Sequence, residues 1–251
     1  LMSLQNLAAG IYSLTVTDAN GCQDSLVNEI TQPQDSITLI YNQSPILCFG
    51  DTTATVDLFV TGGTPQYVYN WSNGADTEDL INMGAGNYTI EVVDSNGCSN
   101  DLNVEVIEPQ LLEIQSNAIN PFCQGGTQGS IDLTIVGGTP SYTYLWNNNE
   151  TTEDIIDLYA GEYIVIVVDS NGCSDTALVL ITDPASLSLS ETHTDVLCYG
   201  DSSAQIDLTV TNGTPSYFFE WSNGQDTEDA TNVSVGNIFV NVYDQNNCGA
   251  F

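Results

Sequence analysis

A period of about 75 residues runs through the sequence and constrains the fold more than any other feature. Trp71, Trp146 and Trp221 lie 75 residues apart. Several short motifs share this spacing: Gly-Thr-Pro at residues 63–65, 138–140 and 213–215, Thr-Glu-Asp at 77–79, 152–154 and 227–229, and Asp-Ser-Asn-Gly-Cys at 94–98 and 169–173, which recurs with changes at 244–248. Such a repeat is typical of a tandem array of small units, each of which contacts mainly its neighbours.

Proline-marked joints at Gln32-Pro33, Glu108-Pro109 and Asp183-Pro184 divide the array into domains. We predict the C-terminal part of a preceding repeat in residues 1–33, and repeat domains in residues 34–109, 110–184 and 185–251. The leading part aligns with the next repeat at an offset of 76, and residues 185–251 stop before the counterpart of the last strand. Both ends therefore fall within a repeat, and we expect the native protein to be longer.

Each unit carries the pattern of β-strands. Residues 55–60 and 131–136 alternate apolar with polar side chains, as half-buried strands do. Gly and Pro follow at intervals of roughly 8–12 residues, which is typical of all-β sandwiches. We predict an all-β fold, a tandem array of Ig-like β-sandwich domains of about 75 residues arranged end to end, with one Trp in each core.

The charge of the chain limits its partners. It has 33 Asp and Glu, no Lys or Arg, and a formal charge of −33. Phosphate binding relies on Lys and Arg, so we expect no nucleic-acid partner. We also expect no membrane insertion, because the sequence has no run of about 18 apolar residues. The carboxylates must face water, accept hydrogen bonds from backbone N–H groups, or bind a cation.

The repeated residues resemble the SprB-type repeats of the giant gliding adhesins of Bacteroidetes bacteria. The likeness rests on Gly62-Gly63-Thr64-Pro65, on residues 67–74 (Tyr-x-Tyr-x-Trp-Ser-Asn-Gly), 85–88 (Ala-Gly-x-Tyr) and 94–98, and on their copies along the chain. The resemblance implies an extracellular, outer-membrane-associated surface filament, exported by the type 9 secretion system, that adheres to substrata during gliding. The repeats also resemble PKD domains, which act as spacers in surface proteins and enzymes.

Seven cysteines without the spacing of a metal site predict disulfides outside the cytoplasm. In an Ig-like topology the first cysteine of a unit follows strand A, and the second lies in the F–G turn at the opposite end of the sandwich. In a straight array the A–B loop of one unit adjoins the F–G turn of the next. This favours pairing at a separation of 125, as Cys48–Cys173 and Cys123–Cys248. Two alternatives stay open: pairing within units (Cys48–Cys98, Cys123–Cys173 and Cys198–Cys248) and pairing across one joint (Cys98–Cys123 and Cys173–Cys198).

The acidic turns have two readings. The Asp-x-Asn-Gly turns at Asp18, Asp94 and Asp169 are candidate calcium ligands, and calcium is the one cofactor that we consider. The alternative is an Asx turn, in which Asp and Asn bond their own backbone. Glu78-Asp79 and its copies are interpreted as a solvated crossing loop. A short pattern resembling Bacteroidetes O-glycosylation sites matches Ser25, Ser36, Thr52 and Thr176.

The sequence contains no catalytic constellation, so we predict that the chain is not an enzyme. His193 is the only histidine, and no Gly-x-Ser-x-Gly elbow accompanies it. The predicted function is a structural repeat segment of a surface adhesin filament for gliding and attachment. Its partners would be adjacent repeats and a surface polysaccharide or substratum. The alternatives are a spacer region of a larger secreted enzyme and an array of carbohydrate-binding modules, which requires that Tyr12, Tyr69 or Tyr159 be accessible.

Overall fold

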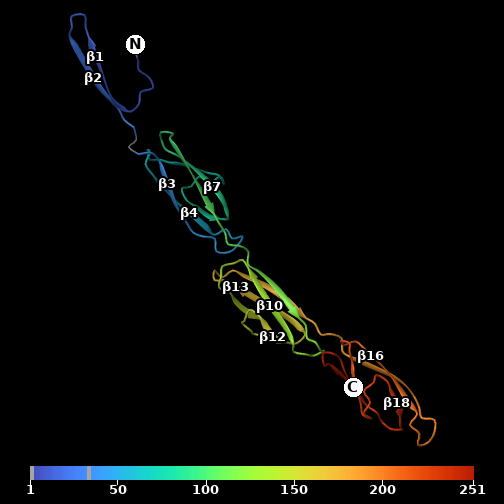
Figure 1. The fold of residues 1–251 in the computed structure, drawn as a ribbon. Coiled ribbons are helices and arrows are strands. Elements are labelled where there is room, and N and C mark those ends of the chain that lie inside the picture. Colours follow the sequence, from blue (N-terminus) through green and yellow to red (C-terminus); the bar gives the residue numbers. More distant parts are fainter. Residues whose placement is uncertain (1–2, 33–34) are drawn as a thin grey trace. The chain divides into compact units, whose positions relative to one another are not determined.

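The computed structural model of the chain describes residues 3–32 and 35–251, and every regular element in these ranges is a β-strand. The chain divides into two compact units, Leu1–Pro109 and Gln110–Phe251. The first unit holds a two-stranded hairpin and one sandwich, and the second holds two more sandwiches (Figure 1). No helix that could cross a membrane is found in the described ranges. The predicted all-β repeat fold is confirmed.

The hairpin of the first unit consists of β1 (Gly10–Thr17) and β2 (Gln23–Ile30). The two strands pair antiparallel from Gly10↔Ile30 to Thr17↔Gln23. Asp18 fixes the turn between them, because its Oδ1 accepts hydrogen bonds from the N–H groups of Asn20 and Cys22 at 2.8 Å each.

The sandwich of the first unit has six strands: β3 (Thr38–Gln43), β4 (Ala54–Thr61), β5 (Val68–Trp71), β6 (Leu80–Met83), β7 (Gly86–Val93) and β8 (Ser99–Val106). They form two antiparallel sheets, β3-β4-β6 and β5-β7-β8 (Figure 1). These sheets correspond to sheets A-B-E and C-F-G of an Ig-like sandwich. The strand order therefore shows that the domain is an Ig-like sandwich. Burial alternates along β4 and β7, as the alternating sequence predicts.

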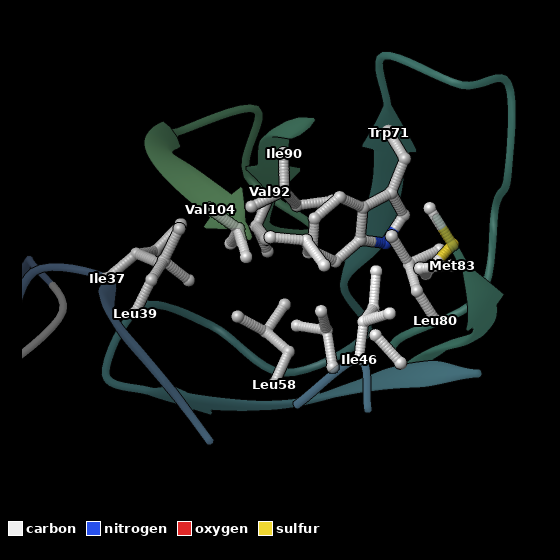
Figure 2. Close-up of a cluster of buried hydrophobic side chains, with 13 residues drawn as sticks. Ile37, Leu39, Ile46, Leu58, Trp71, Leu80, Met83, Ile90, Val92 and Val104 are labelled. Atoms are coloured by element: carbon white, nitrogen blue, oxygen red, sulfur yellow. The ribbon is translucent and has the colours of Figure 1, made fainter. Parts of the chain in front are cut away.

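The core of this sandwich lies between the two sheets. Figure 2 shows the Trp71 indole pointing into a cluster that includes Ile90, Leu80 and Met83. Trp71 is 4% exposed, as the sequence predicts for a core residue. Buried aliphatic side chains of both sheets and of the segments next to β3 complete the cluster: Ile37, Leu39, Ile46, Ala54, Val56, Leu58, Val92, Val104 and Val106.

The second unit repeats this topology twice. Its first sandwich has β9 (Glu113–Ile119), β10 (Gly129–Val136), β11 (Thr143–Trp146), β12 (Ile155–Leu158), β13 (Gly161–Val168) and β14 (Ser174–Ile181). Its second has β15 (Ser188–Thr194), β16 (Ala204–Thr211), β17 (Phe218–Trp221), β18 (Ala230–Val233), β19 (Val240–Tyr243) and β20 (Gly249–Ala250). The sheets are β9-β10-β12 with β11-β13-β14, and β15-β16-β18 with β17-β19-β20.

The last sandwich has the smallest buried cluster of the three: Leu208, Trp221, Ala230, Val233 and Val242. By the repeat period, Phe251 corresponds to Thr176, so no residue of this sequence corresponds to the buried Val179 and Ile181. The strand that pairs with β19 is accordingly short.

The Thr-Glu-Asp motif forms a hydrogen-bond network on each core tryptophan. The Trp71 Nε1–H donates to the Thr77 carbonyl at 2.9 Å, and the Thr77 hydroxyl donates to the Asp79 carbonyl at 2.7 Å. The Asp79 Oδ1 in turn accepts from the N–H of Leu58 on β4 at 3.0 Å. The same bonds recur in the other two repeats. The crossing loop is exposed, as the interpretation as a solvated loop expects, and the Asp79 carboxylate in addition ties this loop to β4.

A tyrosine corner closes the start of strand F. The Tyr88 hydroxyl donates to the Gly84 carbonyl at 3.1 Å, and the Tyr163 hydroxyl donates to the Tyr159 carbonyl at 3.0 Å. Tyr12 makes the same contact with Ala8 at 2.9 Å. This contact is a hallmark of Ig-like sandwiches, and the sequence analysis did not identify it. Ile238 occupies the equivalent position of the last repeat.

Candidate functional site

Cys123 and Cys248 form a disulfide between the two consecutive repeats of the second unit. Cys123 lies in the A–B loop between β9 and β10, and Cys248 lies in the F–G turn between β19 and β20. Their Cα atoms are 5.4 Å apart, and the link closes a separation of 125 residues. The two sulfur atoms thus join the loop of one repeat to the turn of the next.

A buried aspartate positions the F–G turn that carries Cys248. Asp244 is 2% exposed, and its Oδ1 accepts from the N–H groups of Asn246 and Cys248 at 2.9 Å each. Its Oδ2 accepts from the N–H of Thr214, in the B–C loop, at 2.8 Å. The carboxylate therefore fixes the backbone of the disulfide cysteine and binds two loops together.

Asp94 and Asp169 make the same three bonds in their repeats, with the Thr64 and Thr139 N–H groups as the distant donors. Both carboxylates are buried. For Asp18 in the hairpin, the two local bonds are the carboxylate bonds found within residues 3–32 and 35–251. The Asx-turn reading accounts for the local bonds, and the bond to the B–C loop is an addition that the sequence analysis missed.

Glycine at the start of Gly-Thr-Pro lets this loop approach the carboxylate. Gly213 has a φ of +69°, and a Cβ there would lie 2.6 Å from the Leu187 Cδ1 and 3.1 Å from the Asp244 Oδ2. Gly63 and Gly138 also have a positive φ, of +65° and +62°, and a Cβ at either position would lie 3.0 Å from the Oδ2 of Asp94 or Asp169. Any side chain would push the Thr N–H away from its acceptor, which explains why this motif recurs in every repeat.

A second acidic contact holds the A–B loop that carries Cys123. The Gly126 N–H donates to the Cys123 carbonyl at 3.0 Å, and the Gly125 N–H donates to Asp183 Oδ1 at 3.1 Å. Asp183 immediately precedes the proline of the next joint. In the first unit the Gly50 N–H donates to Glu108 Oε2 at 2.6 Å, so the acid before each of these prolines anchors the loop of its own repeat.

The other cysteines decide between the remaining pairings. In the described part of the chain, Cys22, Cys98 and Cys198 carry free, exposed thiols. Pairing within units is wrong, since Cys98 and Cys198 are free and Cys123 is bound to Cys248. Pairing across one joint, Cys98–Cys123 and Cys173–Cys198, is wrong for the same reasons. The link Cys48–Cys173 stays a prediction.

The pKa values of the buried aspartates are lowered in all three repeats. For Asp94 the largest cause is the hydrogen bond from the Cys98 N–H, followed by that from Thr64, while burial acts in the opposite direction. For Asp169 and Asp244 burial is the largest single influence and raises the pKa, but the combined backbone N–H donors outweigh it. The three carboxylates are therefore held in the charged form.

The candidate calcium and glycosylation residues lie as follows. Both oxygens of Asp94 and Asp169 accept backbone hydrogen bonds. Within residues 3–32 and 35–251, no three His, Cys, Asp or Glu side chains form a group that could hold a metal ion. Calcium binding stays a prediction. Glycosylation also stays a prediction, at four side chains that are all exposed: Ser25, Ser36, Thr52 and Thr176.

His193 lies on β15 with a side chain that is 57% exposed, and its Nδ1 is 3.1 Å from Glu191 Oε2. It borders a hollow of about 490 Å³ that is otherwise lined largely by core side chains, among them Ile206, Trp221 and Ile238. Ile238 stands where the other repeats have the corner tyrosine. The hollow lies beside core side chains of the last sandwich, with the histidine at its margin.

The tyrosines that a carbohydrate platform needs differ in exposure. Tyr12 and Tyr69 are half-buried, and the Tyr69 ring packs against the core. Tyr159 is 60% exposed, but Gly84 occupies its position in the first repeat. An aromatic platform is therefore not a shared feature of the repeats.

Comparison with protein families finds the SprB repeat three times, at residues 40–76, 116–151 and 190–226. Each match runs from the first strand of a sandwich through the Trp-containing strand, so the first half of every sandwich is similar to the SprB repeat. The suspected resemblance to SprB-type repeats is confirmed. Comparison with curated proteins gives no match.

Solved structures with some similarity include the eight N-terminal Ig domains of Down Syndrome Cell Adhesion Molecule, at 12% identity and a TM-score of 0.42. That match covers 70% of this chain and 28% of the other chain. A second similar structure is a C-terminal 282-residue fragment of intimin, solved with the intimin-binding domain of its translocated receptor. It is 15% identical with a TM-score of 0.34, and the match covers 62% of this chain and 67% of the other chain. The amphioxus IgVJ-C2 molecule is 18% identical with a TM-score of 0.25, and the match covers 61% of this chain and 99% of the other chain. These scores are too low to establish a shared function.

Proposed function

Because three stretches of the chain are similar to the SprB repeat, we propose that it is a load-bearing repeat segment of a cell-surface adhesin filament used in gliding motility and surface attachment. The observation that carries the proposal is the disulfide from the A–B loop of one repeat to the F–G turn of the next. Links of this kind make neighbouring repeats mechanically dependent on each other. The proposed role is mechanical and involves no catalysis.

The disulfide limits how far the chain can extend under force. It closes a separation of 125 residues, and a pull on the chain ends passes through the S–S bond before it reaches the residues between the two cysteines. At roughly 3.3–3.6 Å per extended residue, the bond withholds about 410–450 Å of chain. A repeat that opens transiently therefore stays close to its neighbour and can refold.

Charge and redox chemistry support the same role. A formal charge of −33 without any Lys or Arg makes neighbouring filaments repel one another, which keeps them dispersed. Disulfides persist in oxidising compartments, in agreement with a position outside the cell. We propose export through the type 9 secretion system on the basis of the SprB repeats.

Single-molecule stretching of the whole chain tests the mechanical role. Pulled from its ends, the oxidised chain should reach a shorter final length than the reduced chain, by about 410–450 Å for the Cys123–Cys248 bond alone. A chain with both Cys48→Ser and Cys123→Ser, which lacks one cysteine of each predicted link, should already have the length of the reduced chain without reductant. Equal lengths of oxidised and reduced chain would contradict the proposal.

Labelling of intact cells tests the location and the motility role separately. An antibody against the repeats should stain the surface of unpermeabilised cells of the source bacterium, and the label should travel along gliding cells. Staining that appears only after permeabilisation, or surface label that stays fixed on gliding cells, would argue against a gliding filament.

A further inference from the structure

The outer face of the β11-β13-β14 sheet in the middle repeat carries an apolar patch. It consists of five aliphatic side chains that are 40–62% exposed: Leu145, Ile164, Ile166, Leu178 and Leu180. Leu145 pairs with Ile166 across β11 and β13, and Ile164 pairs with Leu178 across β13 and β14. Leu180 lies two residues beyond Leu178 on the same face. The five side chains are therefore contiguous on one side of the sheet.

The first repeat has the same sheet with a polar outer face. The equivalent positions hold Asn70, Thr89, Glu91, Asn103 and Glu105, all exposed and paired in the same register. The Asn70 Nδ2 even donates to the Glu91 Oε2, at 3.5 Å. The fold therefore does not require aliphatic residues at these positions, and two carboxylates of the first repeat are replaced by aliphatic side chains in the second.

Contiguous exposed apolar surface on a soluble domain commonly marks an interaction site. A second copy of this chain fits poorly, since each copy carries a charge of −33 and neither has a Lys or Arg to offset the repulsion. A partner with Lys and Arg around an apolar face fits, because its cations would lie against the acidic surroundings while its apolar side chains cover the patch. Glu162, which pairs with Leu180, lies at this margin.

We propose that the outer face of β11-β13-β14 is the docking surface for a basic protein that presents an apolar face bordered by Lys and Arg. The first repeat has polar side chains on this face, and in the last repeat Glu220 and Asn241 stand where the middle repeat has Leu145 and Ile166, so the partner binds the middle repeat in preference to the other two. The proposal is independent of the mechanical role, because it uses neither the disulfide nor the joint between repeats.

The repeats themselves supply the variants for the test. The patch-exchange chain carries Leu145→Asn, Ile164→Thr, Ile166→Glu, Leu178→Asn and Leu180→Glu, which are the side chains that the first repeat has in the same fold. The reciprocal chain carries Asn70→Leu, Thr89→Ile, Glu91→Ile, Asn103→Leu and Glu105→Leu. If the first variant does not fold, the second still tests the patch by gain of binding.

The probe is a synthetic amphipathic peptide of Leu and Lys, with binding to the whole unglycosylated chain measured by fluorescence anisotropy. We expect the patch-exchange chain to bind at least tenfold more weakly than the natural chain, and the reciprocal chain to bind two peptides. The patch-exchange chain is more acidic by two glutamates, so attraction by charge alone predicts tighter binding to it. Equal or tighter binding by that chain would overturn the proposal.

Two further measurements complete the test. Sedimentation of the natural and patch-exchange chains at physiological salt should give the same mass, and a dimer formed only by the natural chain would overturn the proposal in favour of self-association. A photo-crosslinker at position 178, displayed on cells, should capture a protein that the same crosslinker at position 103 does not. That protein, once purified, should bind the natural chain and not the patch-exchange chain. Purified binding that is unaffected by the exchange would refute the assignment of the surface.

Discussion

The first and second repeats are alike inside and different outside. Trp71 and Trp146 are both buried, and both donate from the indole to a threonine carbonyl of the crossing loop. Asp94 and Asp169 make the same three backbone bonds. On the outer face of the C-F-G sheet, however, polar side chains in the first repeat stand where the second has leucine and isoleucine.

The difference separates architecture from recognition. Residues that recur in each repeat engage the core, the loops or the cysteines, so their recurrence reports what the fold needs. Residues that change between repeats at exposed positions are free of that requirement. A binding property that distinguishes the second repeat from the first is therefore expected on its outer faces, and the predictions below test this division.

The largest expected effect is the loss of a core tryptophan. Trp71→Ala and Trp146→Ala should each destabilise their own repeat by about 3–5 kcal/mol, through lost burial and a cavity. Denaturant unfolding followed by far-ultraviolet circular dichroism of the whole chain measures this loss, because each substitution removes the only tryptophan of its own repeat. If the loss of unfolding free energy were several-fold larger in one repeat than in the other, the two interiors would not be equivalent.

A smaller loss is expected at the buried aspartates, and it depends on pH. Their pKa values are lowered in the folded state, so their contribution to stability is present above the unfolded value near 3.8 and disappears as the pH falls through the lower folded values. Asp94→Asn and Asp169→Asn should lower the unfolding midpoint at pH 7 and flatten its decline between about pH 5 and 2. An acid decline unchanged by both substitutions would contradict the assigned role.

The tyrosine corner should contribute less. Tyr88→Phe and Tyr163→Phe each remove one hydrogen bond to a carbonyl and should cost about 0.5–1.5 kcal/mol. Ile238→Tyr in the last repeat is the matched gain-of-contact variant, with the new ring directed toward the hollow beside Trp221. Thermal unfolding of the three variants measures the effects, and a stabilising Tyr→Phe change would refute the corner.

The smallest effect on stability is expected on the outer face. Leu178→Asn and Asn103→Leu should each change the unfolding free energy by at most about 0.5 kcal/mol, because both side chains are exposed. Equilibrium unfolding is the measurement. A loss above 2 kcal/mol for Leu178→Asn would mean that the patch serves the fold of the middle repeat, and the comparison with the first repeat would fail.

Much of the fold could be predicted from the sequence because the same strand and core pattern occurs three times, once in each repeat. The alternation at residues 55–60 predicted β4, and the recurring Trp predicted the core. The tyrosine corner and the bonds of Asp79 and Asp94 to distant loops were missed, since a carboxylate or hydroxyl in a sequence does not reveal which backbone N–H or carbonyl lies near it. The recurrence of both aspartates in all three repeats, and of the tyrosine in the first two, was the available signal.

The disulfide was predicted from the sequence, whereas the apolar patch was not. Loop-to-turn pairing followed from where an Ig-like topology places Cys123 and Cys248, although sequence alone left three pairings open. The patch was missed because single exposed leucines are ordinary. Only a position-by-position comparison of Leu178 with Asn103, and of its four neighbours with theirs, could have found it before the sheet register was known.

The most direct test of the central claim, that disulfides link each repeat to the next, is peptide mapping without reduction. An acid-directed protease is required, because the chain has no Lys or Arg for trypsin. We predict linked peptides that contain Cys123 with Cys248 and Cys48 with Cys173. Linked peptides that contain Cys48 with Cys98 and Cys198 with Cys248 would instead mean separately closed repeats, and would contradict the account.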